Sequence, residues 1–323
     1  MTVRLTVRRE EWERHVGATA TAYGPGLVPV VKGNGYGFGR ATLLPIAAGL
    51  GSRVCVGSVH ELAGVPHDLI AVVLTPTLHP PAERAPDTTI FTVGDPAHVA
   101  ALAGLPGSRV MVKLASTMHR YGSTTEELPA LLAAVDTAGM QVAAFALHLP
   151  LAGADAARLA EIEAWLPHLS AEHELWVSHL QPEAFVALQK RHPSRTFRIR
   201  VGTALWHGIP KGRFLQLSAD VLSTQPVRAG DAVGYFATPA PADGTVVAVG
   251  AGSAHGVAPL DNDDPSRRSP FHFARHRVAL LETPHMHTTM LFVPSGQLCP
   301  AVGERVDLQR PLISTLVDEV EWT

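Results

Sequence analysis

The sequence predicts an α/β fold in two parts: a (β/α)8 barrel of the TIM type over residues 1–215, followed by a smaller all-β domain over residues 216–323. In the first part, short apolar runs alternate with longer segments whose apolar residues recur at spacings of three and four, as amphipathic helices require. In the last third, strand-like runs are separated by turn residues, and no convincing helical pattern remains. A chain of 323 residues suits one large α/β domain with a smaller companion.

Eight apolar runs are the candidates for the barrel strands. They are apolar on both faces, which is typical of parallel strands covered by helices. Eight strands alternating with helices favour a closed barrel, although a doubly wound open sheet would show the same periodicity and stays an alternative. The runs span residues 27–33, 53–58, 69–74, 88–93, 109–114, 142–149, 175–180 and 197–202, with helical patterns such as 124–139 and 156–169 between them.

Composition and charge exclude several classes of partner. Apolar residues make up 46% and charged residues 17%, and the net charge of −3 gives no electrostatic case for nucleic acid or an acidic membrane. The two cysteines, Cys55 and Cys299, lie far apart in apolar stretches and form no disulfide framework. The N-terminus lacks the apolar core of a signal peptide. We therefore expect a cytoplasmic protein with no nucleic-acid or membrane partner and no metal site.

Lys32 directly follows the run that should form the first barrel strand. Catalytic side chains emerge at the C-terminal ends of barrel strands. Apolar surroundings disfavour the ammonium form of a lysine, and a neutral amine can form a Schiff base with an aldehyde. Four glycines at alternate positions from 33 to 39 would let the backbone pass close to a bulky ligand. A lone lysine at a strand end is more commonly a solvated charge, so the flanking sequence decides between the two interpretations.

The segment VVKGNGYGFG, residues 30–39, resembles the lysine motif of the alanine racemase family, which is usually valine-valine-lysine-alanine-asparagine-alanine-tyrosine-glycine-histidine-glycine. The lysine, asparagine and tyrosine of the motif are Lys32, Asn34 and Tyr36, and its histidine is Phe38 in this chain. The resemblance implies that Lys32 binds pyridoxal 5′-phosphate (PLP) covalently and that Tyr36 is among the cofactor contacts.

Other sequence motifs of the family follow in the same order along the predicted barrel. RVMVKLASTMHRYG (109–122) resembles the segment of the fifth strand. The resemblance implies that Arg120 orients the substrate carboxylate and that Lys113 is the lysine often carbamylated in this family. The aspartate usually found two residues after that lysine is Ala115 here, which leaves the carbamylation of Lys113 open.

Three later strand ends complete the implied cofactor site. The resemblance implies that His148 lies against the cofactor ring. It also implies that Ser178 and the backbone amides of Gly202 and Thr203 bind the cofactor phosphate. It makes Arg200 the partner of the pyridine nitrogen. A guanidinium does not give up its proton, so it would leave that nitrogen unprotonated and weaken the electron sink that PLP supplies.

The β domain is implied to supply the second base. RAGDAVGYFATP resembles the family segment that ends in a catalytic tyrosine, which is Tyr235 here. A phenol has an ordinary pKa of about 10, and the resemblance implies help from a hydrogen-bond chain through His148 and Arg200. In the family this tyrosine reaches the site from the other subunit, so a homodimer is implied. The amide of Met286 is implied to meet the substrate carboxylate.

Departures from the family lie mainly in this domain. Its Gly-Tyr-Ala-Asp-Gly segment is Gly-Ser-Ala-His-Gly at residues 252–256, and the sequence stops tens of residues before the usual terminus, without a phosphate-contacting tyrosine. We expect a PLP-dependent amino-acid racemase that interconverts L- and D-alanine through Lys32 and Tyr235. The alternatives are another PLP enzyme of this fold, either a decarboxylase or a racemase of a different amino acid, and a non-catalytic PLP-binding protein.

Overall fold

The computed structural model describes residues 3–80, 85–105, 107–264 and 267–323. Two compact units emerge from the contacts within the chain. The barrel unit comprises Arg14–Gly35 and Arg40–Ile209, and the β unit comprises residues 3–13, Tyr36–Gly39 and Pro210–Thr323. The predicted division placed everything up to residue 215 in the barrel, whereas these contacts group the N-terminal residues and the loop after Lys32 with the β unit.

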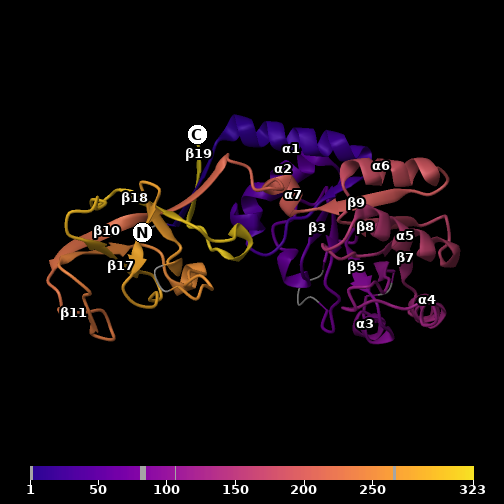
Figure 1. The fold of residues 1–323 in the computed structure, drawn as a ribbon. Helices are drawn as coiled ribbons and strands as arrows, with labels where there is room; N and C mark the ends of the chain where they lie inside the picture. The colour runs from indigo at the N-terminus through magenta and orange to yellow at the C-terminus, as the bar shows by residue number, and fades with distance from the viewer. Residues whose placement is uncertain (1–2, 81–84, 106, 265–266) are drawn as a thin grey trace. The chain divides into compact units, whose positions relative to one another are not determined.

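The barrel unit contains eight parallel strands (Figure 1): β2 (Leu27–Pro29), β3 (Arg53–Val56), β4 (Ile70–Val73), β5 (Ile90–Val93), β6 (Arg109–Lys113), β7 (Gln141–Ala146), β8 (Glu174–Ser178) and β9 (Phe197–Val201). They pair in the order β2-β9-β8-β7-β6-β5-β4-β3. A parallel bridge between Val30 and Cys55 joins the two ends of this sheet, and the amide of Val31 donates to the carbonyl of Cys55 at 2.8 Å. The predicted barrel is therefore confirmed, and the open-sheet alternative is wrong.

Most strand residues are buried on both faces, as the apolar runs predicted. The helices are α1 (Arg9–Tyr23), α2 (Arg40–Leu50), α3 (Pro96–Ala101), α4 (Leu128–Thr137), α5 (Asp155–Trp165), α6 (Pro182–Arg191) and α7 (Thr203–Trp206). Of these, α4 lies within the predicted helical segment 124–139, and α5 begins one residue before the predicted segment 156–169. None of the helices in the described residues is long and apolar enough to cross a membrane.

The alternation of strand and helix is incomplete. Between β3 and β4 the chain forms only the 3-10 turn η3 (Val59–Glu61), and the described residues between β4 and β5 form no helix. Proline explains the second gap, because Pro76, Pro80 and Pro86 lie in this connection and a proline removes a helical hydrogen bond and clashes with the preceding turn.

The β unit confirms the predicted all-β character of the last third. The long strand β10 (Leu215–Val227) pairs on its two edges with β1 (Val3–Val7), β13 (Gly244–Val249) and β18 (Arg305–Leu308), all antiparallel. The other strands are β14 (Phe271–Phe273), β15 (His276–Arg277), β16 (Ala279–Leu280), β17 (Thr289–Pro294) and β19 (Glu319–Trp322), with β11 (Ala232–Val233) and β12 (Thr238–Pro239) forming a separate two-stranded ribbon.

Three aromatic side chains hold distant parts of the β unit together. Trp12 lies 5.3 Å from Phe38 and 5.2 Å from Trp322 between ring centroids, and Phe38 lies 6.1 Å from Trp322. Phe38 therefore anchors the end of the loop that follows Lys32, at the position where the family motif has a histidine. Such an aromatic cluster stabilises the fold in two ways: it removes apolar surface from water, and its rings make favourable edge-to-face contacts.

Candidate functional site

Lys32 lies just beyond the C-terminal end of β2 and is exposed as a residue, although neighbouring groups partly desolvate its amine. The loop after it turns through left-handed backbone conformations: φ is +60° at Gly33, +62° at Gly35 and +57° at Tyr36. A side chain at Gly35 would place its Cβ 2.5 Å from the amide nitrogen of Arg40. Glycine is needed there both for the conformation and for the close approach. This tight turn fixes where Lys32 leaves the strand.

The surroundings of Lys32 favour its neutral amine. Burial lowers the pKa of the Lys32 ammonium, and the positive charges of Arg120 and Arg200 lower it further, against an opposing effect of Glu61. A lysine with a lowered pKa has an unprotonated amine available to attack a carbonyl carbon. These neighbours favour the nucleophilic form of Lys32, although the residue is exposed.

Arg200 lies inside the barrel on β9 and is 8% exposed. Its Nε donates to the carbonyl of Val177 at 3.3 Å, and one terminal nitrogen donates to the carbonyl of Leu147 at 2.7 Å. A guanidinium carries five N–H donors, so these two bonds orient the group and leave donors for a ligand. Cys55, which the sequence analysis considered only for disulfides, is buried, and burial raises the pKa of its thiol to about 12, so the thiol is neutral.

His148 and Ser178 meet at the ends of β7 and β8. The Ser178 hydroxyl lies 2.9 Å from Nδ1 of His148 and accepts from the amide of Leu149 at 3.2 Å. Burial and the nearby charge of Arg200 lower the pKa of His148 to about 2, so the ring is neutral. The resemblance implied a hydrogen-bond chain from Tyr235 through His148 to Arg200, and the structure adds Ser178 as a partner of His148.

A second histidine, His179, was missed by the sequence analysis. Its ring centroid lies 4.7 Å from that of His148, and its Nδ1 donates to the carbonyl of Leu149 at 2.6 Å. Burial lowers the pKa of His179 as well. The available signal was position alone, because His179 directly follows Ser178 at a strand end.

Lys113 is buried, with 3% of its surface exposed, at the end of β6. Its amine donates to the carbonyl of Ala146 at 3.4 Å. Burial lowers its pKa well below the ordinary value, and the positive charges of Arg200 and Arg120 act in the same direction. Arg120 is exposed at the rim, where its guanidinium lies 4.5 Å above the ring of Tyr121.

The helix α7 follows β9 and begins at Thr203, directly after Gly202. The first amides of a helix have no intrahelical acceptor, which suits an anionic group. Lys32, Lys113, His148, Ser178, Arg200 and Gly202 thus all lie at the carboxyl ends of barrel strands, where the topology brings them to one face of the barrel.

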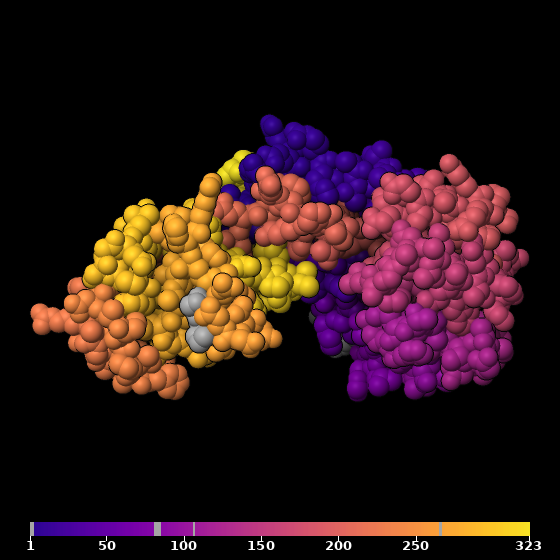
Figure 2. Space-filling view, viewed as in Figure 1, coloured from indigo at the N-terminus to yellow at the C-terminus, as the bar shows by residue number. Residues whose placement is uncertain are grey.

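Tyr235 and Met286 belong to the β unit. Both are exposed, Tyr235 by 83% and Met286 by 67%. Tyr235 lies in the short connection between β11 and β12, and the atoms of this segment project from the surface of the unit (Figure 2). The carbonyl of Met286 accepts from the amide of Ala254 at 2.9 Å, so the backbone at this position is held by the segment that departs from the family motif.

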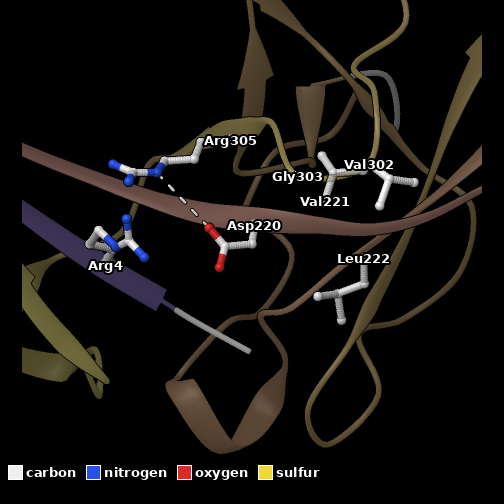
Figure 3. Close-up of a pocket in the computed structure, with 7 residues that line it drawn as sticks. All are labelled: Arg4, Asp220, Val221, Leu222, Val302, Gly303 and Arg305. Carbon is white, nitrogen blue, oxygen red and sulfur yellow. Dashed lines mark ion pairs between the residues drawn. The ribbon is translucent and has the colours of Figure 1, made fainter.

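The β unit also has a surface hollow lined by Arg4, Asp220, Val221, Leu222, Val302, Gly303 and Arg305 (Figure 3). None of the predicted site residues lines it. Its arginines are already paired with carboxylates: Arg4 lies 3.0 Å from Glu319, and Arg305 lies 2.8 Å from Glu321. The hollow therefore lacks the unbalanced charge of the barrel site.

The structure is a closed parallel barrel with a lysine of lowered pKa beyond the end of its first strand, an arrangement that suits covalent binding of a carbonyl compound. Residues 9–210 match the N-terminal domain of alanine racemase, and the chain belongs to the alanine racemase family.

Known relatives agree with this assignment. An alanine racemase of Mycolicibacterium vanbaalenii is 29% identical over 271 residues, which is 72% of this chain and 67% of that protein. Alanine racemase of Bartonella henselae with covalently bound pyridoxal phosphate superposes with a TM-score of 0.75 at 17% identity, covering all of both chains. The Bacillus anthracis alanine racemase with bound L-Ala-P gives a TM-score of 0.74 at 18% identity, over 95% of this chain and 85% of that chain. Both of these structures share the fold of this chain.

Proposed function

We propose that this protein is a PLP-dependent amino-acid racemase with alanine as its substrate. The observation that carries the proposal is the amine of Lys32, whose pKa is lowered by partial desolvation and by two arginines, at the position of the family's cofactor lysine. An alanine racemase relative at 29% identity supports alanine over other small amino acids.

The residues of the barrel site fit the cofactor. Lys32 would bind PLP covalently, and Arg200 has donors left to meet the pyridine nitrogen. Ser178, Tyr36 and the amides of Gly202 and Thr203 would hold the phosphate, because hydroxyl groups and helix-terminal amides are donors for an anion. Bound PLP supplies an electron sink that makes the α-hydrogen of an amino acid acidic.

Two bases on opposite faces of the α carbon would invert its configuration. Lys32 Nζ would take or return the proton on one face, and Tyr235 Oη, supplied by a second copy of the chain, would do so on the other. Arg120 and the amide of Met286 would fix the substrate carboxylate. The homodimer and a cytoplasmic location rest on the family resemblance and the composition.

We also propose that Lys113 is carbamylated. Carbon dioxide reacts with the neutral form of an amine, and burial favours that form of Lys113. The resulting carbamate would carry a negative charge beside Arg120 and Arg200. That charge would balance a cluster that now contains several cationic groups.

The test is solvent exchange with a panel of amino acids in heavy water. The proposal expects deuterium at the α carbon of alanine and formation of its other enantiomer at matching rates. Loss of carboxylate as carbon dioxide would identify a decarboxylase. Cofactor binding with no exchange from any amino acid would identify a non-catalytic PLP-binding protein and overturn the proposal.

A further inference from the structure

The Tyr235 loop of the β unit rests on a buried carboxylate. Oε1 of Glu282 accepts from the amide of Tyr235 at 3.1 Å, and Oε2 accepts from the amide of Phe236 at 3.4 Å. The Glu282 side chain is only 3% exposed. Gly234 precedes these amides with φ of +77°, and any side chain there would collide with the carboxylate. One carboxylate therefore grips two successive amides of the loop.

The same carboxylate holds an imidazole under the tyrosine ring. Nε2 of His285 pairs with Oε1 of Glu282. The His285 ring stacks on the ring of Tyr235, with centroids 4.1 Å apart and planes at 25°. The backbone of His285 is itself fixed, since its amide donates to Thr288 at 2.9 Å and its carbonyl accepts from Ser253 at 2.8 Å. Tyr235 is thus supported through its backbone and through one face of its ring.

This support matters because Tyr235 is otherwise exposed. A phenol with 83% of its surface in solvent would sample several side-chain rotamers, and proton transfer demands one geometry. Burial alone would raise the pKa of the Glu282 carboxyl, but hydrogen bonds from His285 and from the two loop amides outweigh it, and the pKa is lowered. The carboxylate therefore stays ionised and keeps all three donors.

We infer that Glu282 and His285 are positioning residues for Tyr235, forming a clamp that fixes the direction of its hydroxyl group. The inference rests on the proposed function, in which Tyr235 is one of the two bases. Neither residue lies in the family segments compared above. The clamp lies wholly within the β unit, so its formation does not require a partner subunit.

The experiment measures α-hydrogen exchange in heavy water separately for L- and D-alanine with the PLP-loaded enzyme. Tyr235→Phe leaves Lys32 able to exchange the hydrogen on its own face, so exchange should survive for one enantiomer and fail for the other. Glu282→Gln and His285→Ala should weaken exchange of that same second enantiomer by about 10- to 100-fold, the range expected of a misplaced group, and spare the first. Neither should weaken exchange further in a Tyr235→Phe background.

Glu304→Gln is the matched control, because the Glu304 carboxylate also accepts a loop amide, that of Ala301 at 2.7 Å, elsewhere in the β unit. It should leave both exchange rates unchanged. A second readout is independent of turnover: the chain has four tyrosines, so labelled tyrosine rings can be assigned by NMR, and His285→Ala should shift the Tyr235 ring signal through loss of the stacked ring.

The outcomes separate the two claims. If Tyr235→Phe weakens exchange of both enantiomers equally, the two-base function fails and the clamp falls with it. If Tyr235→Phe is selective but Glu282→Gln and His285→Ala are not, or if they slow both enantiomers alike, only the clamp is wrong. Should Glu282→Gln fail to fold, His285→Ala decides the matter.

Discussion

The barrel unit buries several of its candidate residues, although Lys32 and Arg120 are exposed, whereas the β unit exposes both of its own. Ser178, Lys113 and Arg200 in the barrel are 1%, 3% and 8% exposed, whereas Tyr235 and Met286 in the β unit are 83% and 67% exposed. Barrel residues are fixed by the strands that enclose them, and burial itself changes their protonation. The β-unit tyrosine keeps contact with solvent and is fixed by a clamp of neighbouring side chains.

This difference assigns different chemistry to the two units. The barrel collects groups whose ammonium or imidazolium forms are disfavoured, which prepares it to bind a carbonyl compound and an anion. The β unit presents a single phenol whose direction, and not its burial, is controlled. Substitutions in the barrel should therefore alter cofactor binding and pH dependence, while substitutions around Tyr235 should alter stereochemistry.

The largest expected effect is that of Lys32→Ala. Removing the amine removes the only bond by which the chain would hold PLP covalently, so the visible absorbance band of the bound cofactor and all racemisation should disappear. The measurement is absorbance of the purified protein after reduction with borohydride and denaturation, which leaves label only on a covalent imine. Lys190→Ala, at an exposed helical position, should keep the label. If the Lys32→Ala variant kept the label, Lys32 would not be the residue that binds PLP covalently, and the barrel could not be assigned as the cofactor-binding unit on this ground.

Lys113→Ala should have an intermediate effect. A hydrogen bond to a charged group contributes about 1.5–3 kcal/mol. Losing that much transition-state stabilisation lowers activity by roughly 10- to 100-fold. Protein equilibrated with ¹³C-bicarbonate should show a carbamate carbon signal by NMR that is absent from Lys113→Ala. Added acetate should partly restore the variant's activity by supplying a carboxylate. A native protein without the signal would show that the amine stays unmodified, and the barrel cluster would then lack the negative charge of a carbamate.

The barrel and its lysine could be predicted from the sequence because both depend on local pattern. Double-sided apolar runs identify parallel strands wherever they occur, and Lys32 lies beside one of them. The incomplete helices were not predicted, although Pro76, Pro80 and Pro86 were visible signals against a helix between β4 and β5.

Long-range pairings were beyond such reasoning. β1 pairs in parallel with β19, and the amide of Val3 donates to Asp318 at 2.8 Å, across almost the whole chain. Neither strand shows in its own sequence which partner it will take. The contacts of Phe38 with Trp12 and Trp322 were invisible for the same reason.

His255 has a structural role that the comparison with the family motif did not reveal. The sequence analysis recorded residues 252–256 only as a departure from the family segment. In the structure His255 is 4% exposed, accepts from the amide of Gly252 at 3.1 Å and lies 3.3 Å from the carboxylate of Asp318. It therefore fastens the C-terminal segment to the β unit, a role that depends on a partner more than 60 residues away.

The smallest expected effect tests the electrostatic side of the comparison. Burial and Arg200 lower the pKa of His148 from its ordinary 6.5 to about 2. Between these values the unfolded chain binds a proton at this ring and the folded chain does not, so the free energy of unfolding should fall as the pH is lowered from 7 to 5. This one ring contributes about 2 kcal/mol to that fall, because pH 5 lies about 1.5 units below the ordinary pKa and each unit is worth about 1.4 kcal/mol.

His148→Asn should therefore be less stable than the native protein at pH 7 but lose less stability on acidification, as measured by urea unfolding at the two pH values. His272→Asn offers the comparison from the β unit: burial lowers the pKa of His272 too, but the ring is only partly buried, so the change should have the same sign and be smaller. If His148→Asn and the native protein lost equal stability between pH 7 and pH 5, the ring would be accepting its proton in the folded state. The barrel interior would then disfavour a charged ring no more than the surface of the β unit does. Burial could not then explain the electrostatic difference between the barrel unit and the β unit.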